Sequence, residues 1–349
     1  MLDHPDQMAR LDPQGLGRLL EQFPAQCREG LALAGRLPPF PRSIRAVVVA
    51  GMGGSAISGD LISSLLYQSM TVPLHVVRGY DCPSWVDADS LVVAVSYSGE
   101  TEETLSVFHQ AVERSATLAA ITSGGVIARE AEHRNIPLVA IPKGLPPRSA
   151  LGYLFFPLLR ILERAHVGNA PDQAIEEALA LLERECDSVG PSSPAERNPS
   201  KQLAQALAGK TAIVYGASSL TDSVAYRWKT QIEENAKAFA VSGSIPECDH
   251  NEVEGWHGDP LTSRFHAVFL RDRGESQRIA KRMEVTRGIA SRRAGTTEVW
   301  SKGEGRLARI LSLIQVGDWV SYYLAMLRGV DPWPVTAIEH LKQKLGNPY

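Results

Sequence analysis

The first half of the chain alternates short, uniformly apolar runs with segments whose apolar residues recur at helical spacing. Runs rich in Val, Ile and Ala and bounded by turn residues are typical of buried parallel strands. They lie at 46–50, 74–77, 91–95, 118–121 and 138–141. Helical patterns lie between them, through 61–66 and at 102–114 and 126–134. This alternation predicts an α/β fold in which a doubly wound parallel sheet carries helices on both faces.

The pattern restarts after a polar segment. Helical patterns surround the first sheet at 9–36, 149–165 and 172–187. The segment 191–200, PSSPAERNPS, has the proline and serine content of a linker. Beyond it, strands are expected at 211–215, 266–270 and 297–300, with helices at 220–236, 274–289 and 304–328. We therefore expect a first domain with its N-terminal helices at 1–190, a linker at 191–200, and a second, smaller α/β domain with a C-terminal helix at 201–349.

Composition narrows the class of protein. The 349 residues carry a net charge of −3, with 21% charged residues of nearly balanced sign. This balance argues against a nucleic-acid surface. The four cysteines are widely spaced without a CxxC pair, as expected of free thiols in a reducing cytoplasm. The N-terminus has no apolar signal region, and we expect no membrane span.

The loop that follows the apolar run 91–95 is the most informative motif. It reads SYSGETEET over 96–104, so hydroxyls and a glycine replace the strand pattern and lead into a helix. Such loops present backbone N–H and side-chain O–H groups to an anion at a helix N-terminus. Because the loop contains no Lys or Arg, it predicts a phosphate held by neutral donors.

A second glycine-rich loop follows the strand at 46–50. Its sequence, GMGGSAISG, allows a dinucleotide-binding interpretation. The acidic residue that this fingerprint needs after the next strand is misplaced, since Arg78 precedes Asp81. Two loops rich in Gly, Ser and Thr instead predict one ligand site at the carboxyl edge of a parallel sheet. Two ordinary βα turns with serine caps are the plainer alternative.

Further polar residues are candidates for chemistry. Arg148, in PPRSALG, is either a solvated arginine or a fixed cation over developing negative charge. The segment 227–256 is densely polar and contains Glu234 and His250, residue types that carry protons in catalysis. The spacing of its Glu and His residues matches no metal signature, and no metal is expected.

Together these motifs resemble those of the bifunctional phosphoglucose/phosphomannose isomerases of the sugar isomerase (SIS) domain superfamily. The resemblance rests on GMGGSAISGD, SYSGETEET, PPRSALGY and the Glu-Asn-Ala-Lys…Pro-Glu-x-x-His-Asn-Glu pattern of 234–252. It covers nearly the whole chain and implies an SIS-type domain on each side of the linker. It departs from the family pattern at Glu233 and Asp249, where the family usually has asparagine.

The resemblance implies a role for each matching residue. The 6-phosphate would be held by Ser55, Ser96, Ser98 and Thr101, with Gly53 and Gly54 lining the sugar. Arg148 would stabilise an enediolate, and Glu234 would move a proton between C2 and C1. His250, supplied by the partner subunit of a homodimer, would open the sugar ring. Lys342 would assist the ring opening. Lys342 is preferred over Lys344 because it fits the family's helix pattern better.

The implied reaction interconverts glucose 6-phosphate and mannose 6-phosphate with fructose 6-phosphate in the cytoplasm, with no cofactor. Three alternatives remain. Another SIS-domain sugar-phosphate isomerase would share the phosphate loop but lack the block from Glu234 to His250. A non-catalytic sugar-phosphate sensor would need a DNA-binding motif, and the N-terminal helices carry no basic stripe. A nucleotide-dependent dehydrogenase is disfavoured by the misplaced acid.

Overall fold

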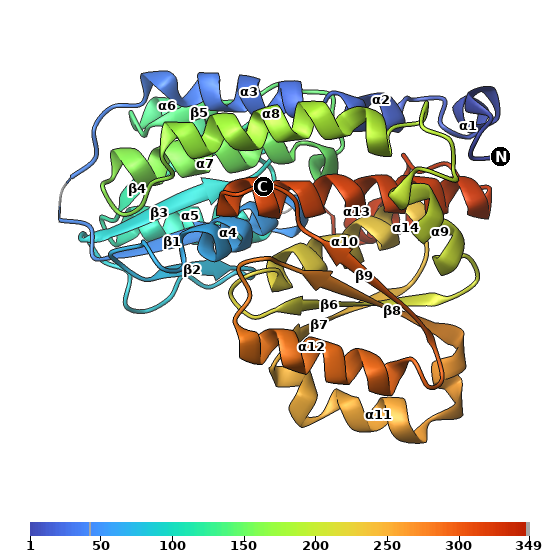
Figure 1. Cartoon of the computed structure of the whole chain (residues 1–349). Coiled ribbons are helices and arrows are strands. Elements are labelled where there is room, and N and C mark those ends of the chain that lie inside the picture. The colour runs from blue at the N-terminus through green and yellow to red at the C-terminus, as the bar shows by residue number, and fades with distance from the viewer. Residues whose placement is uncertain (42, 347–349) are drawn as a thin grey trace. The chain divides into compact units, whose positions relative to one another are not determined.

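The computed structural model describes residues 1–41 and 43–346 (Figure 1). The chain forms two compact units. One, here the β1–β5 unit, consists of Gln22–Pro171 and the described residues from Ala337. The other, the β6–β9 unit, consists of Met1–Glu21 and Asp172–Thr336.

The β1–β5 unit is built on a parallel sheet with the strand order β2-β1-β3-β4-β5. The strands are β1 (Ala46–Ala50), β2 (Leu74–Val77), β3 (Ser90–Val95), β4 (Thr117–Thr122) and β5 (Leu138–Ala140). The helices are α3 (Phe23–Leu33), α4 (Gly53–Leu66), α5 (Glu102–Glu113), α6 (Gly125–His133) and α7 (Leu151–Arg164). All residues of β1 and β3 are buried, as their uniformly apolar sequences predict.

Helices cover both faces of this sheet. Val48 and Val92 pair across β1 and β3 and share a core with Phe108 of α5 and Ile127 of α6. On the other face, α4 approaches so closely that a Cβ on Gly59 would lie 3.1 Å from a methyl of Val49. The doubly wound arrangement predicted from the sequence is confirmed.

The β6–β9 unit holds a second parallel sheet with the order β7-β6-β8-β9. Its strands are β6 (Thr211–Ala217), β7 (Ala240–Ile245), β8 (Phe265–Arg271) and β9 (Gly295–Trp300). Its helices are α1 (Pro5–Leu11), α2 (Leu16–Glu21), α8 (Asp172–Val189), α9 (Pro199–Leu207), α10 (Asp222–Ala236), α11 (Glu252–Gly258), α12 (Gln277–Ala290) and α13 (Arg306–Arg328). The last helix, α14 (Thr336–Leu345), starts at the unit's final residue.

The segment 191–200 lies within the β6–β9 unit. Lys201 is completely buried, and its ammonium donates to the carbonyls of Pro191 at 3.0 Å and Ser193 at 2.7 Å. The side chain of Asn198 caps α9 by accepting from two backbone N–H groups. The bounds of the compact units thus differ from the domain limits expected from the sequence. Those limits, 1–190 and 201–349 with a linker between them, stay a prediction.

Helix α13 has the length and composition of a membrane span. In this fold, however, 89% of its most apolar stretch is buried within the protein. It therefore has the environment of a core helix.

Candidate functional site

The two glycine- and hydroxyl-rich loops meet at the carboxyl edge of the β1–β5 sheet. Strands β1 and β3 are adjacent and parallel, so the loop before α4 and the loop before α5 leave the sheet side by side. The Tyr97 amide donates to the Ser55 hydroxyl at 3.3 Å, which joins one loop to the other. The structure therefore brings together the Gly53–Ser55 and Ser96–Thr101 segments.

The hydroxyls of the second loop form a compact group. The hydroxyl oxygens of Ser96 and Thr101 lie 3.0 Å apart, and the Ser96 hydroxyl also accepts from the Gly99 amide at 3.1 Å. The Ser98 hydroxyl accepts from the Glu100 amide at 3.2 Å and is exposed. Thr101 is the N-cap of α5 without a capping bond from its side chain. Hydroxyl and amide donors thus gather at a helix N-terminus, where an anion is stabilised.

Close backbone contact fixes the shape of this loop. Gly99 has φ +70°, and a Cβ there would lie 1.9 Å from the carbonyl oxygen of Gly124. Only glycine fits this position. Tyr97 anchors the loop to the segment that follows β5, since its hydroxyl donates to the Pro142 carbonyl at 2.9 Å and accepts from the Leu145 amide at 2.8 Å. Burial raises the pKa of this tyrosine, so it remains a neutral anchor.

Arg148 belongs to the same edge of the sheet. It lies in a 3₁₀ turn, Pro147–Ser149, and is only 3% exposed. A Cβ on Gly54 would lie 2.9 Å from the Pro147 carbonyl oxygen and 3.2 Å from the Arg148 Cα. The start of α4 and the Arg148 turn are therefore in direct contact. The alternative of a solvated arginine is wrong for this residue.

Glu234 lies in the last turn of α10, in the β6–β9 unit. Its neighbour Glu233 is engaged by Lys229, one turn earlier on the same helix, at 2.9 Å. Asn235 is completely buried, and its amide donates to the Ser321 hydroxyl of α13 at 2.9 Å. These contacts fix the helix end on both sides of Glu234.

His250 ends a 3₁₀ turn, Glu247–His250, that follows β7, and it is exposed. Glu234 comes before β7 and His250 comes after it. Six residues of strand span about 20 Å, so the two residues lie toward opposite ends of β7. A hexose phosphate is much shorter than this distance. The structure does not bring Glu234 and His250 of one chain to a common point.

Lys342 and Lys344 lie on α14, all of whose residues are exposed. Residues two apart on a helix differ by about 200° in direction, so the two lysines point to different sides. Lys342 shares a face with Ile338 and Leu345, which are 41% and 65% exposed.

The sequence analysis did not identify the row of buried hydrogen bonds between α10 and α13 that supports the helix turn of Glu234. The amide of Gln231 donates to Asp318 at 3.0 Å, and Arg227 donates to the same carboxylate at 2.6 Å. The four-residue spacing of Arg227, Gln231 and Asn235 was a usable signal, since it places all three on one helix face. Within the residues that the structure describes, no three His, Cys, Asp or Glu side chains are placed to hold a metal ion.

Comparison with known proteins gives consistent similarities. Residues 42–156 match the model of the SIS domain, and residues 196–345 match that of the bacterial phospho-glucose isomerase C-terminal SIS domain. The chain is 41% identical over 307 residues to the bifunctional phosphoglucose/phosphomannose isomerase of Caldicellulosiruptor bescii, which covers 86% of this chain and 90% of the relative. It is 37% identical to the protein of the same name from Aquifex aeolicus, covering 86% and 90%. In fold, it resembles the crystal structure of a hypothetical protein from Thermus thermophilus, with a TM-score of 0.76 at 18% identity, covering 98% of this chain and 94% of that one.

Proposed function

Because the chain belongs to the bifunctional phosphoglucose/phosphomannose isomerase family, we propose that it interconverts glucose 6-phosphate and mannose 6-phosphate with fructose 6-phosphate. The observation that carries the proposal is the similarity to relatives so named, 36–41% identical over 86% of this chain. The cluster of neutral donors at the start of α5 supports a phosphorylated substrate.

In the proposed site, one group of residues binds the substrate and another transfers the proton. Ser55, Ser96, Ser98 and Thr101 bind the 6-phosphate, while Gly53 and Gly54 line the sugar. Neutral donors suit a substrate whose product must also leave, because they bind a dianion without a permanent ion pair. The buried Arg148, next to Gly54, supplies the positive charge that stabilises an enediolate.

Glu234 serves as the base in this proposal. It takes the proton from C2 of an aldose and returns it at C1, giving the ketose through a cis-enediolate. In the reverse direction, the base returns the proton to C2, and which face of the enediolate the substrate presents to it decides between glucose and mannose 6-phosphate. Glu234 is preferred over Glu233 because Asn235-Ala236-Lys237 follows it, as in the family pattern.

His250 opens the ring from the partner subunit of a homodimer, and Lys342 assists it. The separation of Glu234 and His250 along β7 supports the shared site, since one chain offers no common point for both. Lys342 is proposed over Lys344 because it fits the family's helix pattern better. The proposed scheme uses no cofactor, and the widely spaced cysteines support a cytoplasmic location.

The test is to incubate the purified protein with fructose 6-phosphate and measure glucose 6-phosphate and mannose 6-phosphate separately. We expect both aldoses to accumulate, with and without EDTA. Formation of neither product would refute the proposal, and formation of one alone would refute the dual specificity. Activity lost to EDTA and restored by zinc would refute the metal-free scheme.

A further inference from the structure

We propose that Arg282 and Thr286 of α12 are positioning residues for His250, acting through the carboxylate of Asp249. This inference rests on the proposed function, in which His250 opens the sugar ring.

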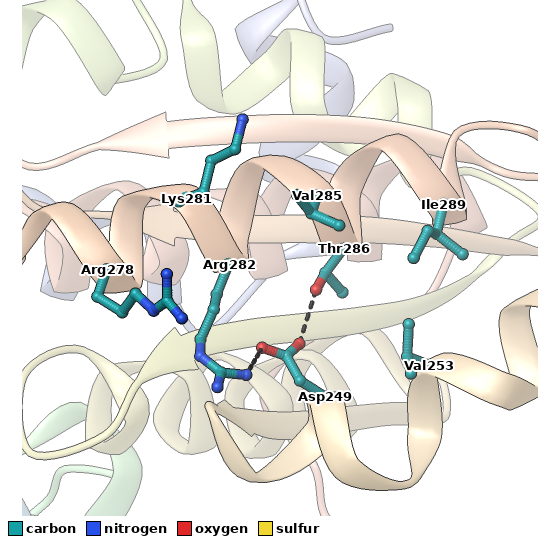
Figure 2. Close-up of a pocket in the computed structure, with 8 residues that line it drawn as sticks. All are labelled: Asp249, Val253, Arg278, Lys281, Arg282, Val285, Thr286 and Ile289. Carbon is teal, nitrogen blue, oxygen red and sulfur yellow. Dashed lines mark hydrogen bonds and ion pairs between the residues drawn. The ribbon is translucent and has the colours of Figure 1, made fainter.

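Both oxygens of the Asp249 carboxylate are held by α12. The Arg282 guanidinium donates to one oxygen at 3.0 Å, and the Thr286 hydroxyl donates to the other at 2.6 Å. Figure 2 shows these two contacts reaching Asp249 from neighbouring turns of one helix. The Asp249 side chain is 10% exposed and Thr286 is 3% exposed, whereas the Arg282 side chain is 34% exposed, so the Thr286 contact is the better shielded from water. The residue directly before His250 is therefore tied to a regular helix.

The other residues near His250 in the sequence are also held in place. Cys248 is buried in the core of the β6–β9 unit, and Asn251 caps α11 by accepting from the Glu252 amide at 2.7 Å. The side-chain amide of Asn251 also donates to the Glu247 carboxylate at 3.0 Å. His250 is thus an exposed side chain on a short turn whose neighbours are all anchored. Such a turn aims a side chain while leaving its ring available to a ligand.

Apolar packing holds the turn at Cys248, which shares a core with Met283 and Ala290 of α12, and the polar contacts add a separate attachment at Asp249. A pocket of about 270 Å³ opens between α11 and α12, lined by Val253, Val285 and Ile289 together with Asp249 and the α12 cations (Figure 2). Val253 and Ile289 line this space, and Ile289 also packs against the core of the unit. The bonds from Arg282 and Thr286 therefore fix the Asp249 side chain beside this open space, directly before His250. An aspartate at position 249 suits them because a carboxylate accepts on both oxygens, whereas an asparagine accepts on one only.

The test compares a substrate that must open its ring with one that need not. The variants are Arg282→Met and Thr286→Val, with Arg278→Met and Lys281→Met as controls from the same pocket that leave Asp249 untouched. One assay follows turnover of glucose 6-phosphate. The other follows C2 proton exchange with solvent deuterium on a four-carbon aldose phosphate, which forms no pyranose ring.

We expect Arg282→Met and Thr286→Val to slow glucose 6-phosphate turnover by about 10- to 100-fold, the range for a misplaced catalytic group. Exchange on the open-chain substrate should stay within about twofold, because the base and the phosphate loop are unaffected. Arg282→Lys, which keeps the charge, should recover part of the loss, and it provides a test if Arg282→Met fails to fold. A merely structural role would lower both activities together.

Three results would overturn the inference: equal loss in both assays, no loss in either, or equal effects from the control variants. If the wild-type protein isomerises neither substrate, the proposed function itself fails. A normally active wild type with an unchanged ratio of the two activities in the variants refutes only the role of Arg282 and Thr286.

Discussion

Arg227 and Asp318 form an ion pair of 2.6 Å inside the β6–β9 unit, with side chains that are 2% and 7% exposed. Arg227 lies on α10 and Asp318 on α13, 91 residues apart in the sequence. Gln231 donates to the second oxygen of the same carboxylate, and Asn235 reaches Ser321 one turn further along. Burial raises the pKa of Asp318, while Arg227 acts against that shift. The pair fixes the register of α10, and with it the position of Glu234.

We predict that Asp318→Ala lowers the free energy of unfolding by about 3–5 kcal/mol, because it leaves the Arg227 guanidinium buried without its carboxylate. The double variant Arg227→Met/Asp318→Leu should lose much less, since no charge then remains buried. Urea denaturation at pH 7 measures both. Lys281→Ala, which removes an exposed ion pair with Glu284, serves as a control and should cost at most about 1 kcal/mol. A small effect of Asp318→Ala would show that the pair does not fix the helix.

Glu234 and Glu233 offer a matched pair for testing the base. They are adjacent on α10 and so differ by about 100° in direction. We predict that Glu234→Gln lowers kcat by about 10²- to 10⁴-fold and abolishes exchange of the C2 proton with solvent deuterium. Glu233→Gln should have a mild effect, because its partner is Lys229. The reverse pattern would place the base one residue earlier, and full activity of both variants would exclude a carboxylate base at this helix end.

The hydroxyls before α5 are expected to control affinity for the phosphate. Loss of one hydrogen bond to a charged group costs about 1.5–3 kcal/mol, so Ser98→Ala should raise KM by about tenfold or more. Ser96→Ala should behave similarly and also disturb the loop, since that hydroxyl contacts both Thr101 and the Gly99 amide. Ser106→Ala is the control, because this hydroxyl on α5 donates to the Tyr80 carbonyl instead. Unchanged KM values for both loop variants would place the phosphate elsewhere.

A shared active site predicts complementation between inactive subunits. Glu234→Gln chains and His250→Ala chains should each be inactive alone with a cyclic substrate. Mixed under conditions that allow exchange of subunits, they should regain activity, because a hybrid dimer contains one site with both functional residues. Sedimentation at the assay concentration measures the oligomeric state. A fully active monomer would contradict the shared site.

The sequence predicts most of the fold because its strands are unusually uniform. All five residues of β1 and all six of β3 are buried, so periodicity alone locates them. Strand β7 was missed because Ser242, Gly243 and Ser244 interrupt its apolar pattern, and its residues are mostly half-buried. Its place at the edge of the sheet explains this composition.

The support of the candidate site is harder to predict than its chemistry. Motifs select Ser96, Glu234 and His250 because those residues are close to characteristic neighbours in the sequence. The contacts of Arg227 with Asp318 and of Arg282 with Asp249 join residues 91 and 33 positions apart, and no local pattern encodes such pairs. Lys201 shows the same limit, since a lysine beside a polar segment predicts a solvated surface, whereas this one is completely buried.

His266 gives the β6–β9 unit a predicted dependence of stability on pH. The residue lies on β8, is 7% exposed, and its Nε2 is 2.8 Å from the Thr297 hydroxyl. Burial lowers its pKa, with a further contribution from the charge of Lys210. The folded state therefore keeps the ring neutral where the unfolded chain already takes up a proton. The contribution of His266 to stability is complete above the unfolded pKa of about 6.5 and is lost as the pH falls through the lower, folded pKa.

We therefore predict that the free energy of unfolding falls as the pH decreases below about 6.5, by at most about 1.4 kcal/mol per pH unit from this one group. His266→Gln removes the titrating ring and keeps a group able to bond to Thr297, so its stability should fall less steeply over the same range. Urea denaturation of both proteins between pH 7.5 and pH 5, at about unit intervals, gives the free energy of unfolding as a function of pH. The difference between the two slopes is the contribution of His266. Identical slopes for the wild type and His266→Gln would mean that His266 becomes protonated equally easily in the folded and unfolded states.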